Sequence, residues 1–298
     1  DFTVLGNEVE LDWLRESIRD KFEVKFRARL GPEAKDDKSV RLLNRAIHWT
    51  EEEIKYEADQ RHAELVIKDL GLDARSNSVV TPGGKKDEES MSKRLDKQRA
   101  LRYRANVARC NYMCQDRSDV QFQVKELCRA MSDPSEADWL MLKRLARYLI
   151  GRSRVVLMFA YQGSHGVVDV WTDTDYARCR VSRKSTSGGV VMLGSHMIKS
   201  WSSTQANVSL SSGEAEYYGL VQGASVAIGV RSMHAEMGMH NPNLFTMTPS
   251  YKIDNLLSVR GGRRNLVLAR AMGGAIEDRY VCDGAPMRLA SSAMDNQI

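Results

Sequence analysis

Three acidic residues in the second half of the chain stand where carboxylates could act together. Asp173 ends an apolar run, Glu216 lies in the first turns of an expected helix, and Asp254 ends another short apolar run. Strands that end at one edge of a sheet bring such side chains together, where they repel one another and lose hydration. Divalent cations offset that charge, and carboxylate oxygens suit Mg²⁺. We therefore expect these three residues to hold magnesium.

Two acidic residues compete for the helical position. Glu214 and Glu216 are separated by about 200° around a helix axis, so they cannot have the same role. Glu216 shares a face with Leu220, Ala224 and Ala227, whose side chains would pack on a sheet. Glu214 lies in the first turn, where a carboxylate suits the helix dipole. We therefore choose Glu216 as the ligand.

A simpler interpretation exists for each strand-end carboxylate. Taken singly, Asp173 or Asp254 would be a turn former or a helix cap. Asp175 would share the strand face of Asp173 if the strand continued, but we expect it in the following loop. Three carboxylates in one topology favour the metal site.

The elements that would position these residues follow from periodicity. Strands are expected at 155–161, 167–172, 189–193 and 197–202, a helix at 212–238, a short strand at 251–253 and a helix from 255. We predict that one sheet begins at 155 and that the long helix packs on it.

The first half of the chain is expected to contain more helix than strand. A strand at 2–5 precedes a helix capped by Asn7, a hairpin and a helix follow over 41–71, and residues 75–94 form a polar linker. Val120, Val124, Leu127 and Met131 mark one helix. A second helix is expected to start with Asp133 as N-cap, Pro134 in the first position and Glu136 in the third, and to end at Gly151.

Composition bounds the class of protein. The 298 residues suffice for two ordinary domains, and 42% hydrophobic with 28% charged residues is typical of globular proteins. The net charge of +5 weakly favours polyanionic partners. Five cysteines without zinc-site spacing indicate reduced thiols in an intracellular protein. No long apolar run or basic leader is present, so we expect no membrane partner.

The carboxylates lie in motifs that resemble the ribonuclease H of copia-type retrotransposons. Residues 171–177 resemble its aromatic-Ser-Asp-x-Asp-Trp-Ala run, 183–188 its RKSTSG, 200–205 its SWSSxxQ, 210–217 its LSSTEAEY, and 253–255 its Cys-Asp-Asn. The resemblance implies an α/β ribonuclease H-like domain, a mixed sheet with flanking helices. Its catalytic, metal-binding carboxylates would be Asp173, Glu216 and Asp254.

The first half resembles the end of the same family's reverse transcriptase. Residues 102–105 resemble its YRSxVG, 117–120 its RPDI, 131–134 its MSNP and 145–149 its RVLRYL. The resemblance implies an α+β palm/thumb remnant: palm with a mobile linker at 1–95, a helical thumb or connection region at 96–154, and the nuclease with a divergent tail at 155–298. Asp1 would be the second Asp of the polymerase Tyr-Val-Asp-Asp turn, so we expect no polymerase activity from this segment.

The chain departs from the family pattern in three places. Gly189 stands where the family has an aromatic residue, and 263–266 lack its Lys-His element. The fourth carboxylate of the family lies in an Ala-Asp-x-x-Thr-Lys segment. Asp278, Asp283 and Asp295 lack that context, so none is assigned.

The resemblance implies hydrolysis of RNA in RNA/DNA hybrids with two Mg²⁺ ions, or Mn²⁺ in their place. Arg183, Lys184, Ser185 and Thr186, expected in the loop after the first strand, could hold phosphates of the hybrid, although a solvated turn explains them equally well.

Three functions stay open: an active nuclease, an inactive polyprotein remnant that retains only nucleic-acid binding, and a DDE-type integrase. The integrase would usually need a zinc-binding His/Cys segment, which the sequence lacks. The implied partners are nucleic acid and the remainder of the polyprotein, in a cytoplasmic particle or the nucleus.

Overall fold

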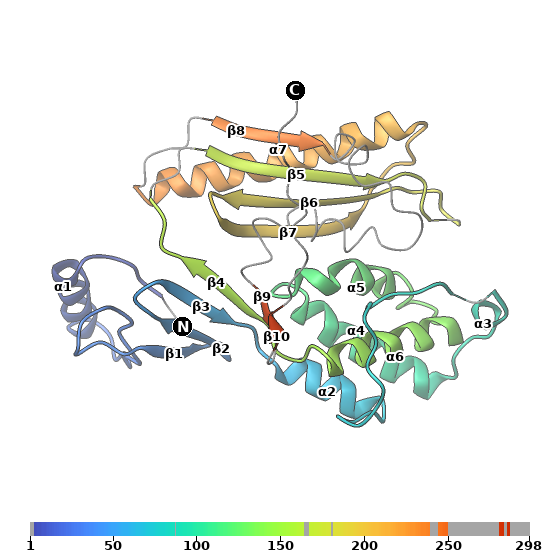
Figure 1. Ribbon diagram of the computed structural model, residues 1–298, viewed down its shortest axis with the longest axis horizontal. Helices are drawn as coiled ribbons and strands as arrows, with labels where there is room; N and C mark the ends of the chain where they lie inside the picture. The colour runs from blue at the N-terminus through green and yellow to red at the C-terminus, as the bar shows by residue number, and fades with distance from the viewer. Residues whose placement is uncertain are drawn as a thin grey trace.

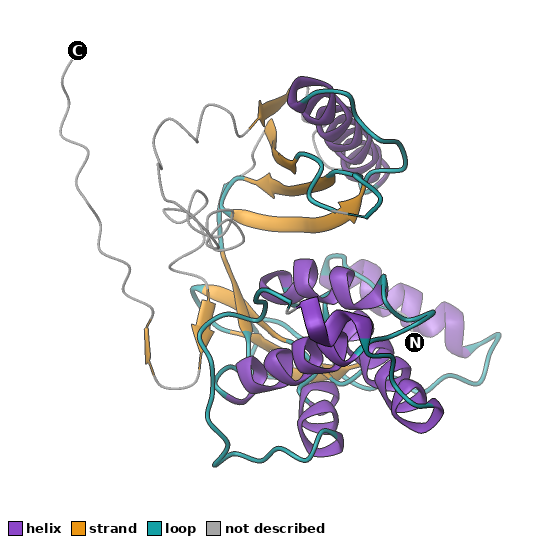
Figure 2. Cartoon of the chain, turned by 90° about the vertical axis from the view of Figure 1, so that its right-hand side faces the viewer, coloured by secondary structure: helices purple, strands orange, loops and turns teal. Residues whose placement is uncertain are grey.

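The computed structural model describes residues 3–86, 88–163, 167–179, 181–238, 244–249, 280–282 and 285–286. Within these residues the chain forms two sheets and a group of packed helices, a mixed α+β architecture (Figure 1). The second sheet, with one long helix on it, lies over the packed helices in both views (Figure 2).

The first sheet is antiparallel between all its described neighbours. Its order is β1 (Ser39–Leu42), β2 (Arg45–Trp49), β3 (Glu53–Glu57), β4 (Val156–Ala160), β9 (Tyr280–Cys282) and β10 (Ala285–Pro286). The hairpin predicted within 41–71 is confirmed, and Leu43 and Asn44 join β1 to β2 with φ of 48° and 63°. Positive φ at both central residues is the geometry of a type I′ turn, whose twist suits a hairpin.

The strand predicted at 155–161 forms, but not in the predicted sheet. β4 pairs with β3, from Val156 opposite Glu57 to Ala160 opposite Glu53. Arg154 reinforces this junction, because its Nε lies 2.9 Å from a carboxylate oxygen of Glu57. The prediction that this strand begins the second sheet is therefore wrong.

The first helix, α1 (Glu8–Arg19), begins as predicted. The side chain of Asn7 accepts a hydrogen bond from the backbone N–H of Glu10 at 2.9 Å, which satisfies one of the unpaired donors of the first turn. The strand predicted before it is not formed at residues 3–5.

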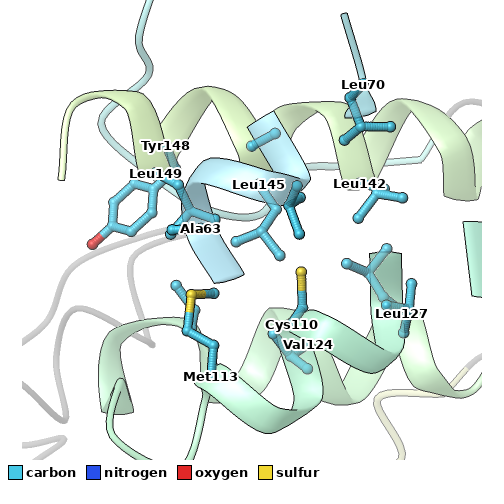
Figure 3. Close-up of a cluster of buried hydrophobic side chains, with 14 of the residues drawn as sticks. Ala63, Leu70, Cys110, Met113, Val124, Leu127, Leu142, Leu145, Tyr148 and Leu149 are labelled. Carbon is cyan, nitrogen blue, oxygen red and sulfur yellow. The ribbon is translucent and has the colours of Figure 1, made fainter. Parts of the chain in front are cut away.

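The packed helices form the largest apolar core in the described residues; we call them the helical unit. They are α2 (Arg61–Asp69), α4 (Lys97–Met113), α5 (Gln121–Cys128) and α6 (Glu136–Ile150), with the short α3 (Glu88–Ser92) beside them and a 3-10 turn at Ser118–Val120. Leu127, Leu142, Leu145 and Leu149 are fully buried between these helices (Figure 3). Tyr103 is also fully buried, and its hydroxyl donates to the carbonyl of Leu127 at 2.8 Å.

The start of α6 lies two residues later than predicted. The N-cap is Ser135, not Asp133, and Ser135 and Asp138 form a capping box in which each side chain bonds the backbone N–H of the other residue. Both residues are buried, whereas Asp133 is exposed and pairs with Arg94. Gly151 ends the helix as predicted.

The segment predicted as a mobile linker runs along α6 and is bonded to it. Arg144 donates to the Thr81 hydroxyl and the Gly83 carbonyl at 2.7 and 2.8 Å, and Arg147 donates to the Asn77 carbonyl at 2.7 Å. Basic residues of α6 thus hold this polar segment against the helical unit.

The second sheet has the order β7-β6-β5-β8 in its described part. The strands are β5 (Val167–Asp175), β6 (Thr186–Leu193), β7 (His196–Thr204) and β8 (Leu244–Pro249). β5, β6 and β7 are antiparallel neighbours, whereas β8 is parallel to β5, so the sheet is mixed as predicted. The long α7 (Ser212–Glu236) supplies the crossover and covers one face. The strand predicted at 251–253 lies outside the described residues.

Gly189 in β6 has a packing reason. It pairs with Trp201 of β7, and a Cβ atom on Gly189 would overlap the Trp201 ring. The ring fills the space over the glycine and packs with Val168, Val170 and Val191. The Trp201 ring thus occupies the space in which a side chain at position 189 would lie.

None of the described helices is both long enough and apolar enough to cross a membrane. Cys110, Cys114, Cys128 and Cys179 carry free thiols.

The capping box predicts a difference between two substitutions before α6. Ser135→Ala removes the cap and should lower the free energy of unfolding by about 1–2 kcal/mol. Asp133→Ala loses only an exposed ion pair, which is worth less than about 1 kcal/mol. Urea unfolding followed by circular dichroism measures both, and an equal loss from the two variants would contradict the assignment of Ser135.

Two glycines should respond oppositely to the same substitution. Gly189→Ala forces the Trp201 ring away and should destabilise by about 1–3 kcal/mol. Gly229→Ala lies on the exposed side of α7 with open space around it, and should stabilise by about 1 kcal/mol. Urea midpoints of both variants against the unmodified chain provide the measurement; a neutral Gly189→Ala would show that Trp201 adjusts freely.

Candidate functional site

The alternation of β5 divides its side chains between the two faces of the second sheet. Val168, Val170 and Thr172 are buried, and the two valines pack with Ala227 of α7. Thr174 continues this face, since its Cγ2 atom lies 2.6 Å from the place of a Cβ on Gly219. Because successive side chains point to opposite faces, Asp173 points away from α7.

α7 rests on the sheet through a line of small residues. Ala215, Gly219, Gly223 and Ala227 are buried at intervals of four. The predicted contact face included Ala227, which is buried, but Leu220 and Ala224 lie one residue, about 100°, away from the buried line. The true line explains how the helix comes so close to the strands.

The two competing glutamates of α7 have different places. Glu214 belongs to the cap: its backbone N–H donates to the hydroxyl of Ser211 at 3.1 Å, and its carboxylate accepts from the N–H of Leu210 at 2.7 Å. Glu216 lies at the border of the buried line, and its Oε2 atom is shielded from solvent. The prediction that Glu214 serves the helix start is thus confirmed.

The start of α7 is tied to the sheet by Gln205. Its amide nitrogen donates to the hydroxyl of Ser187 at 2.9 Å and to the carbonyl of Ala215 at 2.8 Å, and its amide oxygen accepts from Ser209 at 2.9 Å. Gln205 and Ser209 are both buried. This network holds the helical turn of Glu216 beside β6.

Two of the three predicted ligands come to the same end of the sheet. Thr174, next to Asp173, packs on Gly219, one turn after Glu216. The described part of β8 ends at Pro249, opposite Thr172, which is one residue before Asp173.

The predicted metal site is therefore described only in part. Asp254 lies outside the described residues. Within those residues no group of three or more His, Cys, Asp or Glu side chains is arranged to hold a metal ion.

Asp175 was predicted in a loop but belongs to β5. It is the last residue of the strand, paired with Thr186, and it shares the face of Asp173. Its carboxylate binds Arg178 at 2.7 Å. This ion pair gives Asp175 a structural role at the end of β5, beside Asp173.

The four predicted phosphate-binding residues divide into two pairs. Thr186 is in β6, not in the loop, and both Ser185 and Thr186 are buried. Their hydroxyls accept internal hydrogen bonds. The Ser185 hydroxyl accepts from the N–H of Ala177 at 3.1 Å, and the Thr186 hydroxyl accepts from the side chain of Lys125 in α5. Arg183 is exposed and Lys184 partly so. Of the four predicted residues, only the two basic ones, Arg183 and Lys184, are thus accessible to a ligand.

Helix α5 was not predicted to lie near this end of the second sheet, but two basic side chains in its C-terminal part contact it. Lys125 of α5 donates to the hydroxyl of Thr186 at 2.7 Å, and Arg129 donates to the thiol of Cys179 at 2.7 Å. Burial lowers the pKa of Lys125, while neighbouring Glu126 opposes that shift. No sequence signal links residues 50 or 61 positions apart, so these contacts could not be predicted.

Cys179 is unusual among the described cysteines. Its partial burial opposes ionisation, but hydrogen bonds from Ser182 and Arg129 outweigh it and lower the pKa of the Cys179 thiol to about 6. Burial instead raises the pKa of Cys110 to about 12. The loop after β5 is therefore a place where negative charge is favoured.

Sequence comparison finds related proteins. The chain is 33% identical over 162 residues to the uncharacterized mitochondrial protein AtMg00810 of Arabidopsis thaliana, which covers 54% of this chain and 65% of that protein. It is 31% identical over 193 residues to the retrovirus-related Pol polyprotein from transposon RE1 of the same plant, 63% of this chain and 13% of the polyprotein. The Pol polyprotein from transposon RE2 is 33% identical over 147 residues, 48% of this chain and 10% of the polyprotein.

Two of these relatives are retrovirus-related Pol polyproteins. The chain thus has homologues among the Pol polyproteins of copia-type transposons, at about 30–33% identity over part of its length, as its motifs predict. It spans about two thirds of the mitochondrial relative and only about a tenth of the polyproteins. No family model matches the chain, and no solved structure does.

The Gln205 network predicts a strong effect at one glutamine and a weak one at another. Gln205→Ala leaves the buried hydrogen-bonding groups of Ser187, Ser209 and Ala215 without their partner. The free energy of unfolding should therefore fall by about 2–3 kcal/mol. Gln222→Ala loses only a half-buried contact with the Ser203 hydroxyl and should cost less than about 1 kcal/mol. Chemical unfolding of both variants compares them, and a mild Gln205→Ala would mean that the network does not hold α7.

Proposed function

We propose that this segment of a copia-type Pol polyprotein carries a ribonuclease H that hydrolyses RNA in RNA/DNA hybrids. Asp173, Glu216 and Asp254 are its catalytic, metal-binding residues. The nuclease works on nucleic acid alongside the rest of the polyprotein, in a cytoplasmic particle or the nucleus. The residues before the second sheet are the palm and thumb or connection part of a reverse transcriptase.

The observation that carries the proposal is the meeting of β5 and α7. The end of the strand with Asp173 and the first turns of the helix with Glu216 lie together, because Thr174 packs on Gly219. The order strand, strand, strand, helix, parallel strand agrees with the fold that the motifs imply.

The donor chemistry fits the ions. Carboxylate oxygens are the ligands that Mg²⁺ prefers, and an oxygen of Glu216 is shielded from water, where pairing with a cation would offset its charge. Bound Mg²⁺ would supply activation of the attacking water and stabilisation of the leaving 3′ oxygen.

The residues have distinct tasks in this scheme. Asp173 points away from α7 and Glu216 comes from α7, so the two approach the site from opposite faces of β5. They can meet past the described end of β8, where Pro249 lies opposite Thr172. Asp254, in the segment that follows β8 in sequence, is the third ligand of this proposal. Arg183 and Lys184 then bind phosphates of the hybrid.

Cleavage of a labelled RNA/DNA hybrid tests the proposal. With Mg²⁺, Asp173→Asn and Glu216→Gln should each lower the cleavage rate at least about 100-fold, since each loses several kcal/mol of charge stabilisation. Asp169→Asn, on the same strand and the same face four residues earlier, and Glu214→Gln, at the cap, are the matched controls and should stay within about threefold, roughly 0.7 kcal/mol.

Two results would contradict it. Full activity of Asp173→Asn would remove the proposed site. No cleavage by the unmodified chain with Mg²⁺ or Mn²⁺, together with retained hybrid binding, would favour the inactive remnant instead.

A further inference from the structure

Helix α5 lies beside β7, the edge strand of the second sheet, and reaches the end of the sheet that carries Asp173. Gln121 donates to the carbonyl of Ser200 in β7 at 3.4 Å, and Lys125 donates to Thr186 at the start of β6. Thr186 pairs with Asp175, two residues from Asp173 on the same face. α5 thus lies next to β7 (Figure 1), and its Lys125 side chain reaches Thr186 on the face to which Asp173 points.

The loop after β5 folds back onto the same helix. Arg178 lies over one side of the Phe122 ring, 4.7 Å from its centroid, and Lys125 lies 4.5 Å from that centroid. Arg129 bonds Cys179 and reaches the Ser182 hydroxyl at 3.5 Å. Helix and loop thus share one set of contacts.

The tip of this loop is tightly turned. The N–H of Arg183 donates to the Cys179 carbonyl at 2.7 Å, and the N–H of Cys179 donates to the Lys184 carbonyl at 3.3 Å. Arg183 has φ of 57° and is exposed. The turn holds Arg183 and Lys184 beside the residue that Arg129 binds.

The joint surface carries excess positive charge. Its basic side chains come from both parts of the chain, and we call them the joint basic surface: Lys125, Arg129, Arg178, Arg183 and Lys184. Their acidic partners in the described contacts are Glu126, which pairs with Lys125 and Arg129, and Asp175, which pairs with Arg178. Arg129 also binds the Cys179 thiol, whose lowered pKa makes it a third anion. Five cations with three anions still leave an excess that a polyanion would neutralise.

We propose that the joint basic surface is one binding surface for the phosphate backbone of a nucleic acid. Arg129 of the helical unit and Arg183 of the nuclease loop each contact a phosphate of the same strand, and Lys125 holds the two parts in register through Thr186. This deepens the proposed function by adding α5 to the substrate contacts, and it rests on that function for the identity of the substrate.

Phosphate is a better partner for this surface than an acidic peptide. The cations come from the C-terminal half of α5 and from the loop that follows β5, so a ligand that spans both groups passes the end of β5. A regular polyphosphate chain offers a charge at each step, and guanidinium groups bind phosphate oxygens in pairs. An arginine already oriented by a neighbouring contact loses less freedom on binding.

Binding without divalent metal separates this inference from catalysis. The affinity of the whole 298-residue chain for a fluorescent RNA/DNA hybrid is measured by anisotropy in EDTA over a range of salt concentrations. Arg129→Gln and Arg183→Gln should each weaken binding roughly 3- to 10-fold near 0.1 M salt, and each should reduce the slope of log affinity against log salt by about 1.

Two further variants make the test decisive. Arg75→Gln removes an exposed arginine from the turn after α2 and should leave the slope unchanged. Arg129→Lys keeps the charge and should keep most of the slope.

The outcomes decide as follows. Loss of slope in Arg129→Gln but not in Arg129→Lys supports the joint surface. An unchanged slope in Arg129→Gln, or an equal loss in Arg129→Lys or in Arg75→Gln, overturns it, because then α5 contacts no phosphate, acts only through the fold, or contributes only net charge. Absence of cleavage with normal binding would overturn the nuclease and not this surface.

Discussion

The close approach of α7 to β5 and β6 is the constraint on which the candidate site depends. Gly219 leaves no room for even a methyl group beside Thr174, and the buried line of Ala215, Gly219 and Gly223 lets the helix backbone lie near the strands. Gln205 adds direction to this contact, because it joins the first turn of α7 to β6. A helix kept farther away by larger side chains would leave Glu216 out of reach of the end of β5.

Much of this arrangement could be predicted from local patterns. The long helix, the hairpin of β6 and β7, the Asn7 cap and the role of Glu214 at the start of α7 follow from periodicity and helix geometry. The errors concern long-range partners. β4 has the apolar pattern of a strand, but only tertiary structure decides that it pairs with β3.

The remaining misses have local physical reasons. Asp133 and Ser135 are both residue types that favour the N-cap position. Ser135 is the N-cap because it is buried together with Asp138, with which it forms the capping box. Ser185 and Thr186 look like exposed hydroxyls in sequence, yet β6 begins earlier than its apolar residues do and buries them. The residues of α5 that reach the sheet carry no motif, since a charged helix face reads as solvated until its neighbour is known.

The contact between Lys125 and Thr186 is better explained by orientation than by stability. Burial disfavours the charged ammonium, which lowers the pKa of Lys125, and the nearby Glu126 only partly offsets that cost. An apolar side chain could fill the same space without desolvating a charge. What the lysine adds is direction: its hydrogen bond fixes the first residue of β6, the strand that flanks Asp173 and Asp175. The end of the sheet that carries the candidate carboxylates is thus held on one face by the amide of Gln205 and on the other by the ammonium of Lys125, so that neither part of the chain positions it alone.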